Sequence, residues 1–227
     1  MDDIEICRLE HVSKVYYSAE DVCPIDDVSL AISQGDFIGI EGPSGMGKST
    51  LLYLMGGGLL RPTRGSLWLS GKDTSKLSDR ELTSLRAKTI GFIFQETSLF
   101  PALTALENVE MAMFLSKRSR LTQVEKKHAV ALLTDLGLKE RAVFLPHQLS
   151  IGQRRRVVVC RAIVNRPSLI LADEPTNDLD PVWAGKVIDL LESSVQEGGA
   201  VVMVNHSGWA NRAYQRYRLE AGKLISA

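Results

Sequence analysis

A glycine-rich segment in the first quarter of the chain has the residue types and spacing of a phosphate-binding loop. Residues 42–50, GPSGMGKST, fit the pattern G-x-x-x-x-G-K-[ST] at every required position. Glycines let the backbone approach phosphate oxygens, the lysine ammonium neutralises the β- and γ-phosphates, and the serine hydroxyl can bind Mg²⁺. We expect a nucleoside triphosphate to bind here through Gly42, Pro43, Ser44, Gly45, Met46, Gly47, Lys48, Ser49 and Thr50.

Two carboxylates follow an apolar segment in the second half of the chain. Residues 169–175, LILADEP, place Asp173 and Glu174 at the end of a predicted strand. In phosphate-loop enzymes the first such carboxylate helps to hold Mg²⁺, and a second can orient or deprotonate an attacking water. His206 follows another apolar run in the same way. The alternative for each is an ordinary polar residue in the turn after a strand.

A second segment suited to anions is LSIGQ, residues 149–153. Ser150 and Gly152 open a predicted helix, and a helix N-terminus attracts anions through free N–H groups and the helix dipole. The chain therefore carries two separate phosphate-facing segments. The basic run that follows, residues 154–156, is expected to form a solvated or salt-bridged helix face.

Hydrophobic periodicity indicates which elements position these groups. Apolar runs predict strands at residues 4–9, 28–32, 37–40, 66–69, 90–94, 169–172 and 201–205. The pattern from 106 to about 166 is mainly helical, with Gly137 as the expected cap of one helix. A closing hairpin is expected to turn at Ala221 and Gly222. Strands at both ends with helices between them predict a sheet-based core with a helical insertion.

Composition narrows the class of protein. Of 227 residues, 44% are apolar and 24% charged, and 27 basic residues balance 27 acidic ones, so bulk charge does not favour nucleic-acid binding. The three cysteines (Cys7, Cys23 and Cys160) are far apart, which favours reduced thiols in a cytoplasmic protein. The acidic start, MDDIEICRLE, does not have the pattern of a signal peptide, and no run of about 18 apolar residues predicts a membrane span.

Taken in order, these motifs resemble the nucleotide-binding subunit of ATP-binding cassette (ABC) transporters over essentially the full chain. The matching segments are GPSGMGKST, Gln95 in FIFQ, LSIGQ, LILADEPT, NDLD at 177–180, and His206. The resemblance implies an α/β fold with a RecA-like phosphate-loop core, an N-terminal antiparallel β subdomain and an inserted α-helical subdomain. It implies one ABC ATPase domain over 1–227, with 1–95 and 162–227 in the core and β subdomain and 96–161 in the helical subdomain.

The resemblance also implies a mechanism. Two cassettes meet head to tail and sandwich two ATP molecules, so that each phosphate loop faces Ser150, Gly152 and Gln153 of the other chain. Mg²⁺ is held by Ser49, Gln95 and Asp173. Glu174 is the general base, His206 and Gln95 contact or sense the γ-phosphate, Asp180 communicates across the dimer, and Tyr16 stacks on adenine in preference to Tyr17.

The implied partners are an integral membrane permease and a second copy of the cassette, with no nucleic acid. The permease is expected to contact residues 96–103, where Leu99, Phe100 and Leu103 could equally be core residues. The chain would then be cytoplasmic and peripheral to the inner face of the cell membrane. Segments such as GFIFQETSLFPALTALENVE are similar to the branch that serves lipoprotein release and macrolide export, which favours export or lipid extraction.

The sequence departs from the family pattern at three places. Ile151 replaces a glycine usual in the LSIGQ segment, and a β-branched residue avoids positive φ, so the approach of this turn to the opposite phosphate could change. We expect hydrolysis to be retained, at a lower or more tightly coupled rate. Ser207 follows His206 where an acidic residue is common, and residues 56–58, GGG, predict an early end to the phosphate-loop helix.

Two alternatives remain. A non-transport ABC ATPase acting on DNA or ribosomes is disfavoured by the charge balance and by the lack of long insertions. A regulatory cassette with weak turnover is suggested by Ile151, but Lys48, Gln95, Asp173, Glu174 and His206 are all present.

Overall fold

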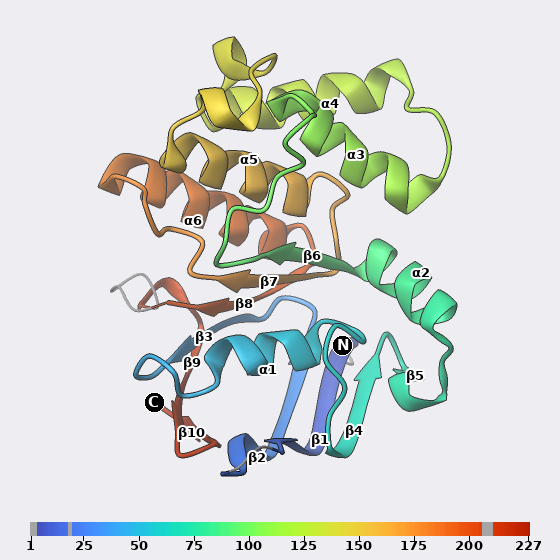
Figure 1. The fold of residues 1–227 in the computed structure, drawn as a ribbon, viewed down its shortest axis with the longest axis vertical. Coiled ribbons are helices and arrows are strands. Elements are labelled where there is room, and N and C mark those ends of the chain that lie inside the picture. Colours follow the sequence, from blue (N-terminus) through green and yellow to red (C-terminus); the bar gives the residue numbers. More distant parts are fainter. Residues whose placement is uncertain (1–3, 18–19, 206–210) are drawn as a thin grey trace.

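Two β-sheets lie on opposite sides of helix α1 (Lys48–Met55) in the computed structural model, which describes residues 4–17, 20–205 and 211–227 (Figure 1). The six-stranded sheet has the order β10-β9-β3-β8-β7-β6, and the four-stranded sheet has the order β2-β1-β4-β5. Helices α3, α4, α5 and α6 lie on the other side of the six-stranded sheet (Figure 1). The fold is therefore the α/β class expected, with an antiparallel N-terminal sheet and a helical insertion.

The N-terminal sheet is antiparallel throughout and begins with two long strands. β1 (Glu5–Tyr16) and β2 (Val22–Ser33) extend well beyond the expected runs at 4–9 and 28–32. Register irregularities interrupt their pairing, so apolar alternation breaks and a periodicity argument finds only part of each strand. The sheet is completed by β4 (Arg64–Leu69) and β5 (Lys72–Asp73), and a 3₁₀ turn, η1 (Thr74–Lys76), follows.

The larger sheet is mainly parallel and positions the functional loops. β3 pairs in parallel with β8 and β9, β8 with β7, and β7 with β6, whereas β10 is antiparallel to β9. The strands are β3 (Phe37–Glu41), β6 (Ile90–Ile93), β7 (Leu169–Asp173), β8 (Ala200–Val204), β9 (Gln215–Glu220) and β10 (Lys223–Ser226). Every residue of β7 and β8 is buried, as in sheets covered on both faces. Their carboxyl ends share one edge, where open α/β sheets bind ligands.

The helical insertion lies between β6 and β7. It contains α3 (Ala105–Lys117), α4 (Gln123–Asp135), α5 (Ile151–Ile163) and two 3₁₀ turns, η2 (Lys139–Arg141) and η3 (Pro146–Gln148). A capping box opens each α-helix, with Thr104, Thr122 and Ser150 as the N-caps. The subdomain limits at 95/96 and 161/162 stay a prediction.

Three expected turns are confirmed. At Gly137 (φ 67°) the Gly137 N–H bonds to Thr134 O and the Leu138 N–H bonds to Leu133 O, which is a Schellman cap of α4. Helix α1 ends at the glycine run, with Gly56 as its C-cap. The hairpin β9–β10 turns at Ala221 (φ 45°) and Gly222 (φ 79°).

Two helices lie where sequence periodicity had predicted none. Helix α2 (Asp79–Thr89) begins at a capping box of Ser78 and Glu81 and buries only two of its residues, so it has little apolar periodicity. Helix α6 (Pro181–Gln196) begins at Asp180, and Pro181 occupies its first turn. Both starts carry recognisable signals, a Ser-x-x-Glu box and an Asp-Pro pair.

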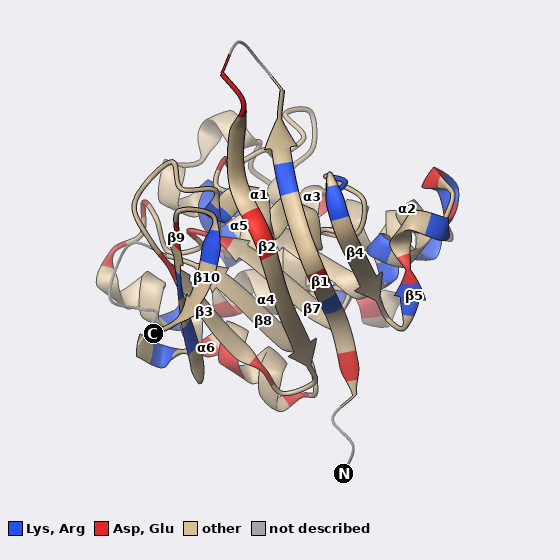
Figure 2. Ribbon diagram, turned by 90° about the horizontal axis from the view of Figure 1, so that it is seen from below, with Lys and Arg blue, Asp and Glu red and all other residues tan. Residues whose placement is uncertain are grey.

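Charged residues are mixed rather than segregated over the N-terminal strands. Figure 2 shows basic and acidic segments alternating along this side of the molecule. Within the described residues, none of the helices combines the length and the apolar character needed to span a bilayer.

Candidate nucleotide-binding site

The phosphate loop joins the end of β3 to the start of α1. Lys48 is 5% exposed, and its Nζ donates hydrogen bonds to Gly42 O (2.7 Å) and Pro43 O (2.8 Å), so the ammonium lies within the curve of the loop. Gly47 has φ 92°, and a Cβ there would lie 2.7 Å from Pro24 O. Only glycine fits at this position, because both the backbone conformation and the space exclude a side chain.

Asp173, at the end of β7, is close to this loop and deeply buried. It is 1% exposed and accepts a hydrogen bond from the Ser49 side chain, and its buried Oδ2 has no hydrogen-bond partner among the described residues. Burial raises the pKa of the Asp173 carboxyl, and the nearby Glu174 adds to this. Burial likewise lowers the pKa of Lys48, while Glu174 and Asp173 oppose that shift. An orphaned carboxylate oxygen beside a serine hydroxyl fits Mg²⁺, which binds one or two protein oxygens together with phosphates.

These groups line one cleft of about 370 Å³. Its walls are formed by Tyr16, Val22, Pro24, Ser44, Gly45, Gly47, Lys48, Ser49, Thr50, Gln95, Asp173 and Glu174. Tyr16 is 43% exposed at the rim, whereas Tyr17 is 74% exposed. The structure thus brings most of the predicted phosphate residues and the predicted metal residues together with Glu174 and Tyr16, whereas Gly42, Pro43 and Met46 do not line the cleft.

Val22 and Pro24 were not foreseen as lining residues. Both belong to β2, and Val22 is paired with Tyr16 of β1. Their place in the cleft depends on the register of the β1–β2 pairing, which no local sequence signal reveals.

Glu174 is directed by an unusual backbone turn. It adopts φ 49°, a left-handed conformation that is uncommon for a residue with a side chain, and its N–H bonds to Val204 O at 2.9 Å. This turn directly follows the buried Asp173, so the two carboxylates lie at the same strand end with different exposure. His206, predicted to contact the γ-phosphate, lies outside the described residues.

The LSIGQ segment lies outside this cleft, at the exposed N-terminus of α5. Ser150 is the N-cap: its Oγ accepts from the Gln153 N–H (3.1 Å), and Gln153 Oε1 accepts from the Ser150 N–H (2.9 Å). A Cβ on Gly152 would lie 2.8 Å from Asp178 O, so glycine allows the segment to contact the β7–α6 loop (residues 174–180). Asp180 is also outside the cleft and caps α6 through Val182 N and Trp183 N.

The prediction that Ile151 conflicts with the backbone conformation of the LSIGQ segment is wrong. Ile151 is the first residue of α5, has no positive φ, and its side chain is 53% exposed. A β-branched residue is compatible with this conformation, so its influence is restricted to the bulk of an exposed apolar side chain beside the helix N-terminus.

The basic run at 154–156 was expected to form a solvated or salt-bridged helix face; Arg155 does pair with Asp178 at 3.6 Å, but the solvated alternative is wrong for two of the three arginines. Arg155 is 2% exposed and Arg156 8% exposed, so neither lies on a solvated face. Arg156 donates to Leu136 O at 2.6 Å and stacks 4.0 Å from the Trp183 ring centroid. Arg155 contacts two loops of the candidate site.

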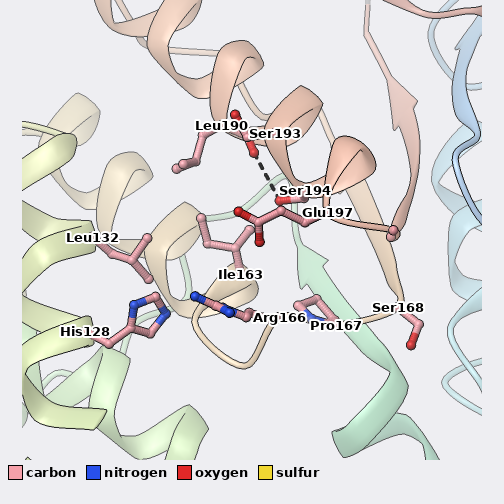
Figure 3. Close-up of a pocket in the computed structure, with 12 residues that line it drawn as sticks. His128, Leu132, Ile163, Arg166, Pro167, Ser168, Leu190, Ser193, Ser194 and Glu197 are labelled. Atoms are coloured by element: carbon pink, nitrogen blue, oxygen red, sulfur yellow. Dashed lines mark hydrogen bonds between the residues drawn. The ribbon is translucent and has the colours of Figure 1, made fainter. Parts of the chain in front are cut away.

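A second hollow, of about 450 Å³, lies at the opposite edge of the sheet between α4, the end of α5 and α6 (Figure 3). His128, Arg166 and Glu197 project from three different segments around its apolar floor (Figure 3). Among the described residues, none that is predicted to act on a nucleotide lines it. This hollow is therefore separate from the cleft at the carboxyl ends of the strands.

Comparison with known proteins agrees with this geometry. The profile of the family described as "ABC transporter" matches residues 25–177. An uncharacterized ABC transporter ATP-binding protein of Methanocaldococcus jannaschii, MJ0796, is 42% identical over 88% of this chain and 86% of its own length. The lipoprotein-releasing system ATP-binding protein LolD 1 of Chlorobium chlorochromatii is 41% identical over 88% of this chain and 81% of that protein.

Two further similarities bear on the branch and the fold. The macrolide export ATP-binding/permease protein MacB of Bartonella henselae is 40% identical over 96% of this chain, which spans 33% of that longer protein. A solved structure of the MJ0796 cassette, a dimer in a post-hydrolysis state with ADP and Pi, superposes with a TM-score of 0.91 and 38% identity over 96% of each chain.

The fold and the cleft define a phosphate-loop ATPase, and the chain belongs to the ABC transporter family. It is an ATP-binding and ATP-hydrolysing subunit similar to the branch that contains LolD and MacB.

Proposed function

We propose that two copies of this chain associate head to tail and hydrolyse two ATP molecules at their interface. The observation that carries the proposal is the separation of two phosphate-facing surfaces. The phosphate loop, Asp173 and Glu174 share one cleft, whereas Ser150 lies outside it at an exposed helix N-terminus. A helix N-terminus directed at a second copy would supply N–H groups to a γ-phosphate bound by that copy. MJ0796, which is similar over nearly its full length, forms dimers in its solved structures.

Within the cleft each residue has a distinct part. Lys48 neutralises phosphate charge, and Tyr16 stacks on the adenine at the rim. Glu174 accepts a proton from the attacking water, assisted by His206 and Gln95 at the γ-phosphate. Mg²⁺, held by Ser49, Gln95 and Asp173, would neutralise charge that develops on the phosphates. Asp180, at the start of α6, would report the nucleotide state across the dimer.

We place the permease contact at the segment after Gln95. The buried Asn108 side chain binds Phe100 N (2.8 Å) and Leu103 O (2.9 Å), so it fixes a turn on which Phe100 is 48% exposed. A groove of about 310 Å³ beside it is lined by Phe94, Phe100 and Leu115. Leu99 instead packs against the hydrophobic core. The predicted contact therefore depends mainly on Phe100.

The transport reaction would be export or extraction of a lipid-linked or hydrophobic cargo. This inference depends on similarity to proteins named for lipoprotein release and macrolide export. ATP binding would close the dimer and hydrolysis would reopen it, which moves the permease between two states. The chain would act at the inner face of the cell membrane through that partner.

Replacement of the proposed base tests the reaction. Glu174→Gln should lower ATP turnover at least ~100-fold, because the water loses its proton acceptor, while ATP binding is preserved. Turnover should be measured with the permease present, and binding with a fluorescent ATP analogue. Hydrolysis within a few-fold of the unmodified protein would refute the assignment of Glu174.

A further inference from the structure

Arg155 connects three functional segments through one buried guanidinium. It lies in the second turn of α5 and is 2% exposed. Its Nη1 donates to Phe94 O at 2.8 Å and its Nη2 donates to Gln95 O at 2.5 Å. The same Nη2 is 3.6 Å from Asp178 Oδ2. The helix that begins with the LSIGQ segment is thereby tied to the Gln95 backbone and to the β7–α6 loop.

The arrangement suits arginine in particular. A planar guanidinium has five N–H donors in a fixed fork, so it can bind acceptors on separate segments at once, which a lysine ammonium on a flexible stem does less well. Burial lowers the pKa of Arg155, and Asp178, followed by Glu174 and Asp173, opposes that shift. The charge is therefore balanced by carboxylates of the candidate site itself.

A contribution to folding stability does not by itself explain the buried guanidinium of Arg155. Among the described residues, the Nε of Arg155 is buried without a hydrogen-bond partner, and an ion pair with a partner as exposed as Asp178 (42%) contributes little net stability. Its partner Asp178 has φ 62°, a left-handed conformation that the surroundings must maintain. An unpaired buried Nε and a partner in a left-handed conformation are both typical of a side chain that holds neighbouring loops in a fixed arrangement.

We propose that Arg155 is a positioning residue that holds the Gln95 loop and the β7–α6 loop in a fixed relation to helix α5. Its contacts at Gln95 are with the backbone carbonyl, so its role is separable from that of the Gln95 side chain. In the head-to-tail dimer, on which this part of the inference rests, α5 faces the other ATP. Arg155 would then link the nucleotide state of its own cleft to the surface that completes the second one.

The first test concerns the isolated full-length chain and does not depend on the dimer. Arg155→Met keeps the length of the side chain and removes both donors and charge. Hydrogen–deuterium exchange should then increase at residues 94–104 and 174–180. The matched control is Arg154→Met, because Arg154 is the preceding arginine of α5 and is partly exposed; it should leave both loops unchanged. Unchanged exchange at both loops in Arg155→Met would overturn the proposal.

The second test separates positioning from simple destabilisation. Arg155→Met should lower kcat for ATP ~10- to 100-fold with little change in KM, because misplacement of about 1 Å costs rate while the ATP-binding groups remain. Arg155→Lys, which keeps the charge, should recover thermal stability but not the full kcat. Full recovery of kcat by Arg155→Lys, or equal losses in kcat and ATP affinity, would overturn the proposal.

The proposed dimer is tested separately, by the dependence of ATPase activity on protein concentration. The specific ATPase activity of the unmodified chain should rise with protein concentration if two copies form the site. A concentration-independent rate would contradict the dimer and the link between the two clefts. The exchange results would still decide whether Arg155 positions the two loops.

Discussion

The carboxylate of Asp173 is placed where ionisation opposes folding. It is 1% exposed, and within the part of the chain that the structure describes its buried Oδ2 has no hydrogen-bond partner. Burial raises its pKa above the ordinary value, so the carboxyl is harder to ionise in the native state than in the unfolded chain. A group with a raised native pKa contributes stability below its unfolded pKa, and that stability is lost as pH rises through the native pKa. The site therefore carries an energetic cost at neutral pH.

Asp173→Asn should stabilise the protein while it abolishes hydrolysis. The amide has similar size and remains neutral, so Tm should rise by about 2–4 °C at pH 7.5, the effect of ~1 kcal/mol for a chain of this length. The gain should be smaller at pH 5 than at pH 7.5, because protonation removes the charge whose burial is unfavourable. Thermal unfolding without nucleotide at the two pH values measures this. A lower Tm for Asp173→Asn at pH 7.5 would show that the ionised carboxylate is stabilising.

The sequence predicted those site residues that belong to a local motif. The phosphate loop, Gln95, Asp173 and Glu174 do line one cleft. The burial of Arg155 was missed because a run of three arginines is usually solvated, and only tertiary packing shows which of them faces inward. The reason given for Ile151 was wrong because a motif does not reveal backbone conformation.

The junction between α4 and α6 leaves no space for a side chain at the residue that caps α4. Gly137, which caps α4, has φ 67°, and a Cβ there would lie 2.1 Å from Cη2 of Trp183 in α6. The same Trp183 ring lies 4.0 Å from the Arg156 guanidinium and 4.5 Å from Lys186 Nζ. This contact joins the helical insertion to the helix that follows the β7–α6 loop.

Gly137→Ala should destabilise the protein by about 2–5 kcal/mol. Alanine in a left-handed conformation costs about 1–2 kcal/mol, and overpacking against Trp183 adds about 1–3 kcal/mol. The matched control is Gly71→Ala, since Gly71 has φ 72° but nothing within 4 Å of the added Cβ. In urea unfolding, Gly71→Ala should lose only the about 1–2 kcal/mol that the left-handed conformation costs. Equal losses in the two variants would show that the Trp183 contact is not tight.

Some helices and strands were predicted from the sequence, and others were missed or made too short. The buried strands β7 and β8 were found because continuous apolar runs identify them. The cap at Gly137 was found because glycine follows the last apolar turn of a helix. Helix α2 was missed because it buries little apolar surface, and β1 and β2 were shortened because register irregularities break their alternation.

In the whole molecule, the two surfaces that the proposed dimer would bring together lie apart. One is the cleft of the phosphate loop, and the other is the exposed N-terminus of α5 with Ser150 and Ile151. No single chain brings them together, since Gly152 packs on the β7–α6 loop of its own chain instead. The resemblance implied that the two surfaces meet only across a dimer, and the structure shows them apart in one chain.

The mass of the Glu174→Gln variant in solution shows whether ATP brings two copies of the chain together. This variant should bind ATP without turning it over, so a sandwich dimer should accumulate. Sedimentation velocity with saturating ATP and Mg²⁺ should give twice the monomer mass, and without nucleotide the monomer mass. A monomer at saturating ATP, in protein shown to bind the nucleotide, would contradict the account.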